Sequence, residues 1–222
     1  NADVYVTGSN AKFLSKDVIT EFRGRGDEIH MLPLSFGEFY SVYEGDYKMA
    51  LGEYLTYGGL PQILFYKTEK QKADYLKGLF EKTYISDIVG RYHVKNEAEL
   101  GELVNIVASA VGSLTNPTKI VNTFATVKNV KITNDTVKKR LDYLCDSFLV
   151  SRAMRYDVKG RRYIDTPSKY YFSDLGLRNA RLNFRQNEKT HLMENMIYNE
   201  LLYRGFNVDV GVVVTEMTSS EG

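Results

Sequence analysis

The chain opens on a β-strand pattern at its third residue. Residues 3–6 (DVYV) are rich in β-forming side chains, residues 7–10 (TGSN) form a polar turn, and residues 11–19 have a helical pattern. A strand, turn and helix of this kind is a step from the interior of an α/β domain, where a buried strand has neighbours. No first half of such a domain precedes it. The sequence therefore predicts a chain that begins inside a domain and is a fragment.

The following residues predict one more short strand and then helices. We expect a strand over Glu28–Leu32, ended by Pro33. Ser35, with Glu38 three residues later, has the spacing of a capping box in front of a helix over 36–43. Residues 47–57 predict a second helix that stops at two glycines. Residues 69–92 carry apolar side chains at helical spacing. We place boundaries at 3–46 for the end of the α/β domain and at 47–93 for a helical region.

The middle of the chain predicts three helices followed by a β-hairpin. The helices are expected over 99–111, from Asn116 to about 127, and over 137–144 with a cap at 134–136. Two strand-like runs, 148–158 and 169–172, follow with a turn at 159–162. This order is typical of a winged helix-turn-helix, which we assign to residues 94–173.

The last segment, residues 174–222, predicts a short helix over 174–182, an amphipathic helix over 190–204 and a strand over 206–214. A helix and one strand do not bury a core on their own. We therefore expect the chain to stop, as it starts, inside a domain.

Composition excludes several classes of protein. The 43% hydrophobic and 26% charged content is that of a globular chain, and a net charge of +1 leaves any nucleic-acid surface to a local patch. One cysteine, Cys145, excludes an internal disulfide, and its apolar surroundings indicate a core residue. Three widely spaced histidines give no metal-ligand pattern. No run approaches the roughly 20 apolar residues of a membrane span, so we expect a soluble, cytoplasmic protein with no membrane contact.

Six stretches, in order along the chain, carry a family resemblance. They are VTGSNAKFLSKD, FRGRGDEI, PLSFGEF, YGGLP, SKYYFSDLGLRN and ENMIYNELLYRGF. Together they resemble the single-chain bacterial and archaeal AAA+ ATPases of the STAND-like archaeal ATPase group. The resemblance implies an α/β plus α+β fold. Its parts are the end of an AAA+ sheet, a helical lid, a winged helix-turn-helix, and the start of a domain of unknown function related to PD-(D/E)XK nucleases.

In that family the phosphate-binding loop and the acidic Walker B strand precede the TGS strand. The pattern G-x-x-x-x-G-K-[ST] occurs nowhere in this sequence. The resemblance thus implies ATP and Mg²⁺ as cofactors of an intact protein. We do not expect this fragment to bind ATP alone, because it lacks the backbone amides and the lysine that hold phosphates.

The resemblance also implies roles for residues around the nucleotide. Asn10, with Ser9, matches the sensor-1 position, where a polar side chain orients the attacking water or contacts the γ-phosphate. Ser9 alternatively caps the helix that starts at residue 11. Arg25 matches a family arginine and is implied to be an arginine finger. Arg23 competes for that role, and both are alternatively solvated turn cations.

The turn at Gly58-Gly59-Leu60-Pro61 matches the GGLP turn of the family lid. Gly59 and Pro61 are therefore implied to respond to nucleotide, although we favour the structural interpretation, in which a Gly-Gly-x-Pro turn ends a helix.

The helix that starts at residue 134 is the candidate recognition helix. Its side chains Asn134, Thr136, Lys138 and Lys139 are candidates for DNA contact, together with Arg161 and Arg162 at the wing tip. Acidic residues on the same helix (Asp135, Asp142 and Asp146) dilute its charge. The alternative is a surface that docks protein. The tyrosines, 17 in number, are interpreted as packing residues rather than base-stacking ones.

Glu194 matches the helix glutamate of the PD-(D/E)XK core, whose carboxylates hold Mg²⁺. No D/E-x-K motif follows it, and an amphipathic helix explains it equally. We therefore interpret the chain as part of an AAA+ ATPase, with a winged-helix DNA-binding module and a metal-dependent nuclease as the alternatives. The partners that follow are DNA, a protein, or a second copy of the ATPase that supplies an arginine finger.

Overall fold

The computed structural model describes residues 5, 7–8, 29–160, 162–185 and 188–212, and for residues 162, 164–166 and 212 the backbone only. The helix expected over 11–19 and the candidate residues Ser9, Asn10 and Arg25 lie outside these ranges. In the described part the fold is mixed: helices predominate, and one small three-stranded sheet joins them.

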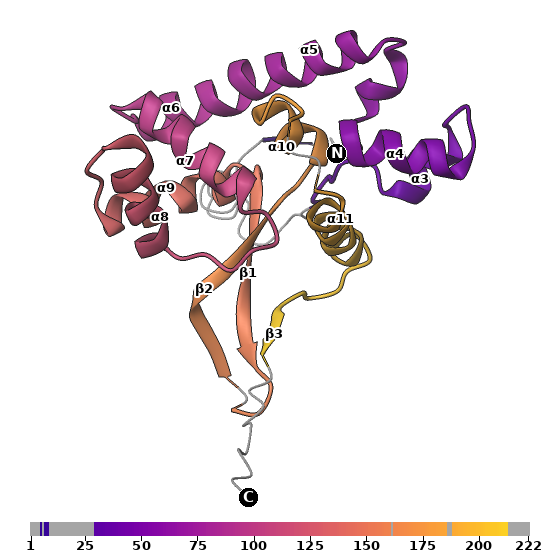
Figure 1. Ribbon diagram of the computed structural model, residues 1–222. Helices are drawn as coiled ribbons and strands as arrows, with labels where there is room; N and C mark the ends of the chain where they lie inside the picture. Colours follow the sequence, from indigo (N-terminus) through magenta and orange to yellow (C-terminus); the bar gives the residue numbers. More distant parts are fainter. Residues whose placement is uncertain (1–4, 6, 9–28, 161, 186–187, 213–222) are drawn as a thin grey trace, which may run out of the picture.

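The first described helices run across the top of the molecule in Figure 1, from α3 and α4 on the right along α5 to α6 on the left. Their bounds are α3 (Phe36–Ser41), α4 (Tyr47–Tyr57), a 3₁₀ helix (Pro61–Phe65), α5 (Glu69–Leu79), a π-helical turn (Phe80–Ile85) and α6 (Ser86–Tyr92). From α5 to α6 the chain is helical without a break, as the spacing of apolar residues over 69–92 predicts. The capping box is confirmed: the Ser35 side chain accepts from the backbone of Glu38, whose carboxylate accepts from the Ser35 backbone.

The order of three helices and a hairpin is also observed. The elements are α7 (Glu97–Ser109), α8 (Pro117–Thr123) with a π-helical turn (Phe124–Lys128), α9 (Asn134–Asp146), β1 (Val150–Asp157) and β2 (Arg162–Phe172). Asn116 caps α8 as expected. The cap of α9 is Thr133 rather than a residue of 134–136, because the Thr133 side chain accepts from the backbone of Thr136.

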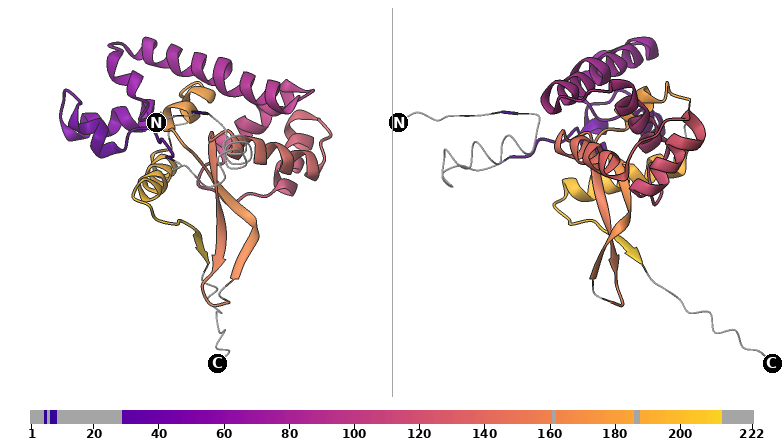
Figure 2. Two further views of the ribbon diagram at one scale, coloured as in Figure 1. Left: turned by 180° about the vertical axis from the view of Figure 1, so that it is seen from behind. Right: turned by 90° about the vertical axis from the view of Figure 1, so that its left-hand side faces the viewer.

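The last described elements are α10 (Leu175–Arg181), α11 (Lys189–Tyr203) and β3 (Val210–Val212). The sheet has the order β2-β1-β3, with β1 antiparallel to β2 and parallel to β3. Figures 1 and 2 show that the end of the sheet that contains β3 extends away from the helices.

Three expected strands differ from the observed ones. Residues 29–32 form no strand, and Ile29 and Met31 are exposed, because no strand pairs with them in the described part of the chain. Strand β2 begins at Arg162 instead of Lys169, because Arg155–Asp157 of β1 pair with residues 162–164 beyond an irregularity in the ladder. Strand β3 begins at Val210 instead of Phe206, because its pairing with β1 spans only Arg155–Asp157.

One hydrophobic core runs through most of these elements. Buried side chains from α5, α7, α9, β1 and β2 belong to a single cluster, which Leu177 and Ala180 of α10 also join. A second, smaller cluster lies between α3, α4, α10 and α11 around Phe39 and Tyr54. The hydrophobic core therefore continues across the domain boundaries that the sequence predicts at residues 93 and 173. The domain assignment itself stays a prediction. No helix in the described ranges is long and apolar enough to cross a membrane.

Candidate functional site

The short helix α10 lies at the centre of the molecule, and six of its seven residues are buried. It contacts α4, α5, α7, α11 and β2. Asp174 caps its N-terminus and is itself buried. One carboxylate oxygen accepts from the Leu177 amide at 3.0 Å, and the other accepts from the Gly59 amide at 2.7 Å. Burial raises the pKa of Asp174 to about 6, although hydrogen bonds from backbone amides oppose the rise.

Three glycines allow this close approach. Gly58 ends α4 with a φ of 78°, and a Cβ there would overlap the Asp174 carboxylate. A Cβ on Gly59 would overlap the Leu34 carbonyl oxygen, and one on Gly176 would overlap the Tyr57 carbonyl oxygen. The YGGLP and SDLGL stretches are thus two halves of one contact between α4 and α10.

Two polar side chains of α10 form further hydrogen bonds, one with the end of α4 and one with the end of α7. Asn179, fully buried, donates to the carbonyls of Leu55 and Thr56 at the end of α4, each at 2.9 Å. Arg178 donates to the Ala108 carbonyl at the end of α7 at 2.9 Å. Burial lowers the pKa of Arg178, yet a guanidinium stays charged at neutral pH. Helix α10 therefore ties the helical region to α7 by hydrogen bonds to helix-terminal carbonyls that would otherwise lack partners.

Helix α11 is attached to the end of β2 through its own polar residues. Asn195, fully buried, accepts from the Phe172 amide and donates to the Phe172 carbonyl, both at 2.8 Å. Glu194 accepts from Lys169 at 2.7 Å and from Tyr171 at 2.6 Å. Burial favours a higher pKa for Glu194, but these two donors and the charge of Lys169 hold that pKa below its ordinary value.

The same helix holds the segment that leads into α3. Glu200 accepts from the Phe36 amide at 2.6 Å, and Tyr203 donates to Glu38 at 2.6 Å. On the other side, the Leu34 amide donates to the Gly59 carbonyl, and Tyr54 donates to the Leu34 carbonyl, each at 2.8 Å. We call this arrangement the junction; it consists of Leu34–Phe36, Gly58–Leu60, Asp174–Gly176 and Glu200. It joins four of the six motif stretches.

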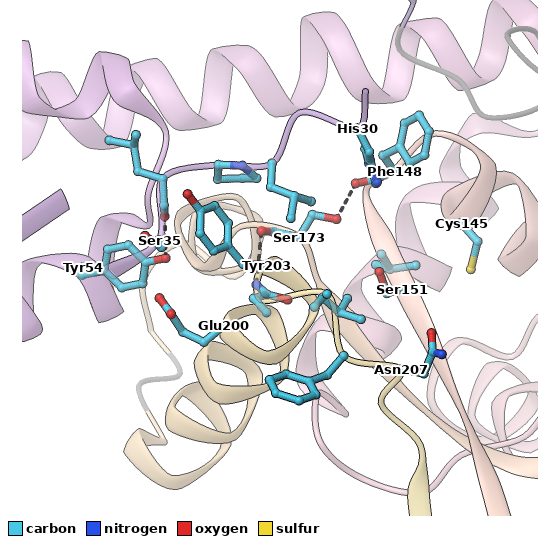
Figure 3. A pocket seen from close by; sticks show the side chains of 18 residues that line it. His30, Ser35, Tyr54, Cys145, Phe148, Ser151, Ser173, Glu200, Tyr203 and Asn207 are labelled. Atoms are coloured by element: carbon cyan, nitrogen blue, oxygen red, sulfur yellow. Dashed lines mark hydrogen bonds between the residues drawn. The ribbon is translucent and has the colours of Figure 1, made fainter. Parts of the chain in front are cut away.

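A cavity of 320 Å³ lies beside the junction, between residues 30–35, the start of β1 and the end of α11. Figure 3 shows Tyr54, Glu200 and Tyr203 at one end of it and Phe148 and Cys145 at the other. Burial raises the pKa of Cys145 to about 12, so its thiol is neutral at physiological pH, as expected of a core cysteine. The volume falls at the lower limit of ligand pockets, roughly 300 Å³.

The predicted residues of the GGLP turn lie inside the junction. The Gly59 amide already donates to Asp174, and Pro61, the first residue of the 3₁₀ helix, has no N–H. Neither residue offers a free amide to a phosphate in this arrangement. The structural interpretation of the turn accounts for both, and a response of the turn to nucleotide stays a prediction.

The predicted DNA-contacting residues of α9 have mixed surroundings. Asn134, Lys138 and Lys139 are exposed and Thr136 is half-buried. Asp135 and Asp142 are exposed on the same helix, three and four residues from the lysines, so this face carries no net charge. Arg161 lies outside the described residues, as does the side chain of Arg162. A DNA interface here stays a prediction.

Glu194 is held by Lys169 and Tyr171, and Glu200 by the junction, so neither is simply a solvated member of an amphipathic helix. In the part of the chain that the structure describes, no group of three or more His, Cys, Asp or Glu residues is placed to hold a metal ion. The nuclease hypothesis stays untested.

Sequence reasoning did not select Asp174, Asn195 or Arg178, although each lies in a quoted motif. A signal was present for Asn195, which falls on the apolar helix face of Leu192 and Tyr198. A polar residue on such a face indicates buried hydrogen bonds.

Comparisons with known proteins show which family the chain belongs to. A family model described as an AAA domain matches residues 1–40, so the N-terminal segment is similar to ATPase-like domains. The model described as "Domain of unknown function (DUF8612)" matches residues 48–188, and the chain belongs to this family. An uncharacterized protein of Haemophilus influenzae is 38% identical over 216 residues, which cover 95% of this chain and 54% of that protein.

An uncharacterized protein of Methanocaldococcus jannaschii is 31% identical over 216 residues, covering 92% of this chain and 48% of that protein. The chain thus spans about half the length of the curated relatives it matches. No solved structure matches it significantly.

Proposed function

We propose that this chain is the coupling part of an AAA-type ATPase, which transmits the nucleotide state of the N-terminal segment to the helices and hairpin. The observation that carries the proposal is the junction. Residues 34–36, which lie in the segment similar to AAA domains, are held by hydrogen bonds to Gly59, Tyr54 and Glu200. A change in the position of this segment therefore acts directly on α4 and α11.

From the junction, the contacts continue through Asp174 and α10. Asn179 bonds the end of α4 and Arg178 bonds the end of α7. Protein interiors are close-packed and have low compressibility, so elements that are packed against each other shift together instead of deforming. A shift of residues 34–36 is thus transmitted across α10 to the three-helix and hairpin region, which has the element order of a winged helix.

The chemical roles in this proposal belong to the N-terminal segment. ATP and Mg²⁺ are the ligands of the complete ATPase, Asn10 and Ser9 position the attacking water or the γ-phosphate, and Arg25 stabilises the charge that develops on the phosphate. The support for these roles is the resemblance of the sequence together with the AAA match over residues 1–40.

The test is Mg·ATP hydrolysis by the full-length gene product that carries this chain. Replacing Arg25 with Ala is expected to lower kcat by roughly 10³-fold or more, the usual value of an arginine finger. Arg23→Ala, two residues earlier in the same turn, is the matched control and is expected to change kcat little. Absence of both hydrolysis and ATP binding in the full-length protein would refute the proposal. Equal effects of the two substitutions would remove the specific role of Arg25.

A further inference from the structure

The wall of the cavity beside the junction contains one carboxylate, that of Glu200, and only one of its two oxygens accepts a hydrogen bond from the described residues. Glu200 lines it, and 20% of its side chain is exposed. Its Oε1 accepts the Phe36 amide at 2.6 Å. Its Oε2 lies 3.8 Å from the Arg204 guanidinium, beyond hydrogen-bond range, and the Arg204 side chain is 68% exposed. Oε2 thus forms an ion pair with Arg204 but accepts no hydrogen bond within the described residues, and a donor that enters the cavity would compete only with this exposed guanidinium.

Carboxylates gather near this end of the cavity, where Glu200 has the exposed Arg204 as its ion-pair partner. Tyr203, which lines the cavity, donates to Glu38, and Asp174 accepts from the Gly59 amide in the junction. Burial and then the charges of Asp174, Glu200 and Glu38 raise the pKa of Tyr54, which lines this end of the cavity. A carboxylate with low solvent exposure attracts a cation more strongly than a surface one, since the effective dielectric constant is lower.

The rest of the wall is mostly apolar and aromatic, with the polar side chains of His30, Ser35, Ser151, Ser173, Asn199 and Asn207 between the apolar ones. Leu32, Leu34 and Val150 come from residues 30–35 and β1, while Phe148, Leu202 and Phe206 supply further apolar area. Such a wall binds an apolar body, and ring faces also attract cations. The cavity thus has an apolar part and one anionic end.

We propose that this cavity is a binding site for a small organic cation, an amine or guanidinium carried on an apolar body, with Glu200 as its counter-ion. The ammonium or guanidinium group donates to Oε2 of Glu200, and the apolar body lies against Leu202 and Phe206. The volume of 320 Å³ restricts the ligand to a small molecule. This inference concerns the chain itself and does not depend on ATP hydrolysis.

The test uses benzylammonium as the probe and benzyl alcohol as its neutral analogue of nearly the same shape, each titrated calorimetrically into the chain. We expect benzylammonium to bind about tenfold or more tightly than the alcohol, as charge-assisted hydrogen bonds exceed neutral ones. Glu200→Gln keeps a carbonyl for the Phe36 amide but removes the charge, and it is expected to abolish this preference. Glu97→Gln, an exposed glutamate of α7, is the matched control and should leave both affinities unchanged.

A second variant separates the two parts of the site. Phe206 is 58% exposed, so Phe206→Ala should leave the fold intact while it weakens both probes by a similar factor. Equal affinity of the two probes, an unchanged preference in Glu200→Gln, or no binding of benzylammonium at millimolar concentration would each overturn the proposal. If Glu200→Gln is poorly folded, the comparison of the two probes on the unmodified chain still tests whether the cavity prefers a cation.

Discussion

Among the described glycines, Gly176 leaves the least room for a Cβ, because α10 lies directly against the end of α4, and Gly176→Ala tests this contact. A Cβ on Gly176 would overlap the Tyr57 carbonyl oxygen, well inside the 3.0 Å below which real Cβ contacts essentially never occur. The obstacle is backbone, so no side chain can rotate away. Either α10 or the end of α4 must move by about 1 Å to reach a normal C···O separation of about 3.3 Å.

That movement stretches hydrogen bonds that are short in the folded state. The Gly59 amide is 2.7 Å from Asp174, and Asn179 donates to Leu55 and Thr56 at 2.9 Å. Each is worth about 1 kcal/mol net, and more where a charged carboxylate accepts. Overpacking itself costs about 1–3 kcal/mol. We expect Gly176→Ala to lower the free energy of unfolding by about 3 kcal/mol or more.

The assay is equilibrium unfolding in urea, followed by far-UV circular dichroism because the chain contains no tryptophan. Gly78→Ala is the matched control, since a Cβ on Gly78, in α5, meets nothing within 4 Å. It should raise the free energy of unfolding by roughly 0.5–1 kcal/mol, the helix propensity difference. A Gly176→Ala variant as stable as the unmodified chain would show that α4 and α10 do not approach as described.

Four further predictions concern other parts of the molecule. Asn195→Ala removes the acceptor of the buried Phe172 amide and one of two side-chain donors to the Phe172 carbonyl, the other being Asn199, so the free energy of unfolding should fall by about 1–3 kcal/mol; a loss below 1 kcal/mol in urea would contradict the pairing. Folding raises the pKa of Asp174 from 3.8 to about 6, so the protonated carboxyl stabilises the fold fully below pH 3.8, and this stabilisation is lost as pH rises through 6. The free energy of unfolding, measured relative to Asp174→Asn, should therefore fall by up to about 3 kcal/mol between pH 3.8 and pH 6. A difference that stays constant with pH would refute burial of the charge. Cys145, with a pKa near 12 instead of 9, should react with a thiol reagent roughly a thousandfold more slowly in the native chain than in urea, and equal rates would place it at the surface. A DNA interface on α9 requires that duplex affinity decrease with salt and decrease again when Lys138 and Lys139 are replaced by Ala; an affinity insensitive to both changes would exclude it.

Local structure was largely predictable from the sequence because its signals are local. Capping residues such as Ser35 and Asn116 mark helix starts through hydrogen bonds that span three residues. The apolar spacing over 69–92 predicts a helix from side chains within a few turns of each other. Strand limits were predicted less well, since the ends of β2 and β3 depend on how far β1 extends beside them.

The sequence by itself determined which motif stretches are present and which residue types they contain. Only the tertiary structure decided that they meet. Asp174 and Gly59 are 115 residues apart, and Glu200 and Phe36 are 164 residues apart, and no periodicity or spacing links positions so distant. Their contact depends on how α10 and α11 pack. The physical reason is that a buried carboxylate needs donors, and the backbone amides that supply them are brought near only when the whole core forms.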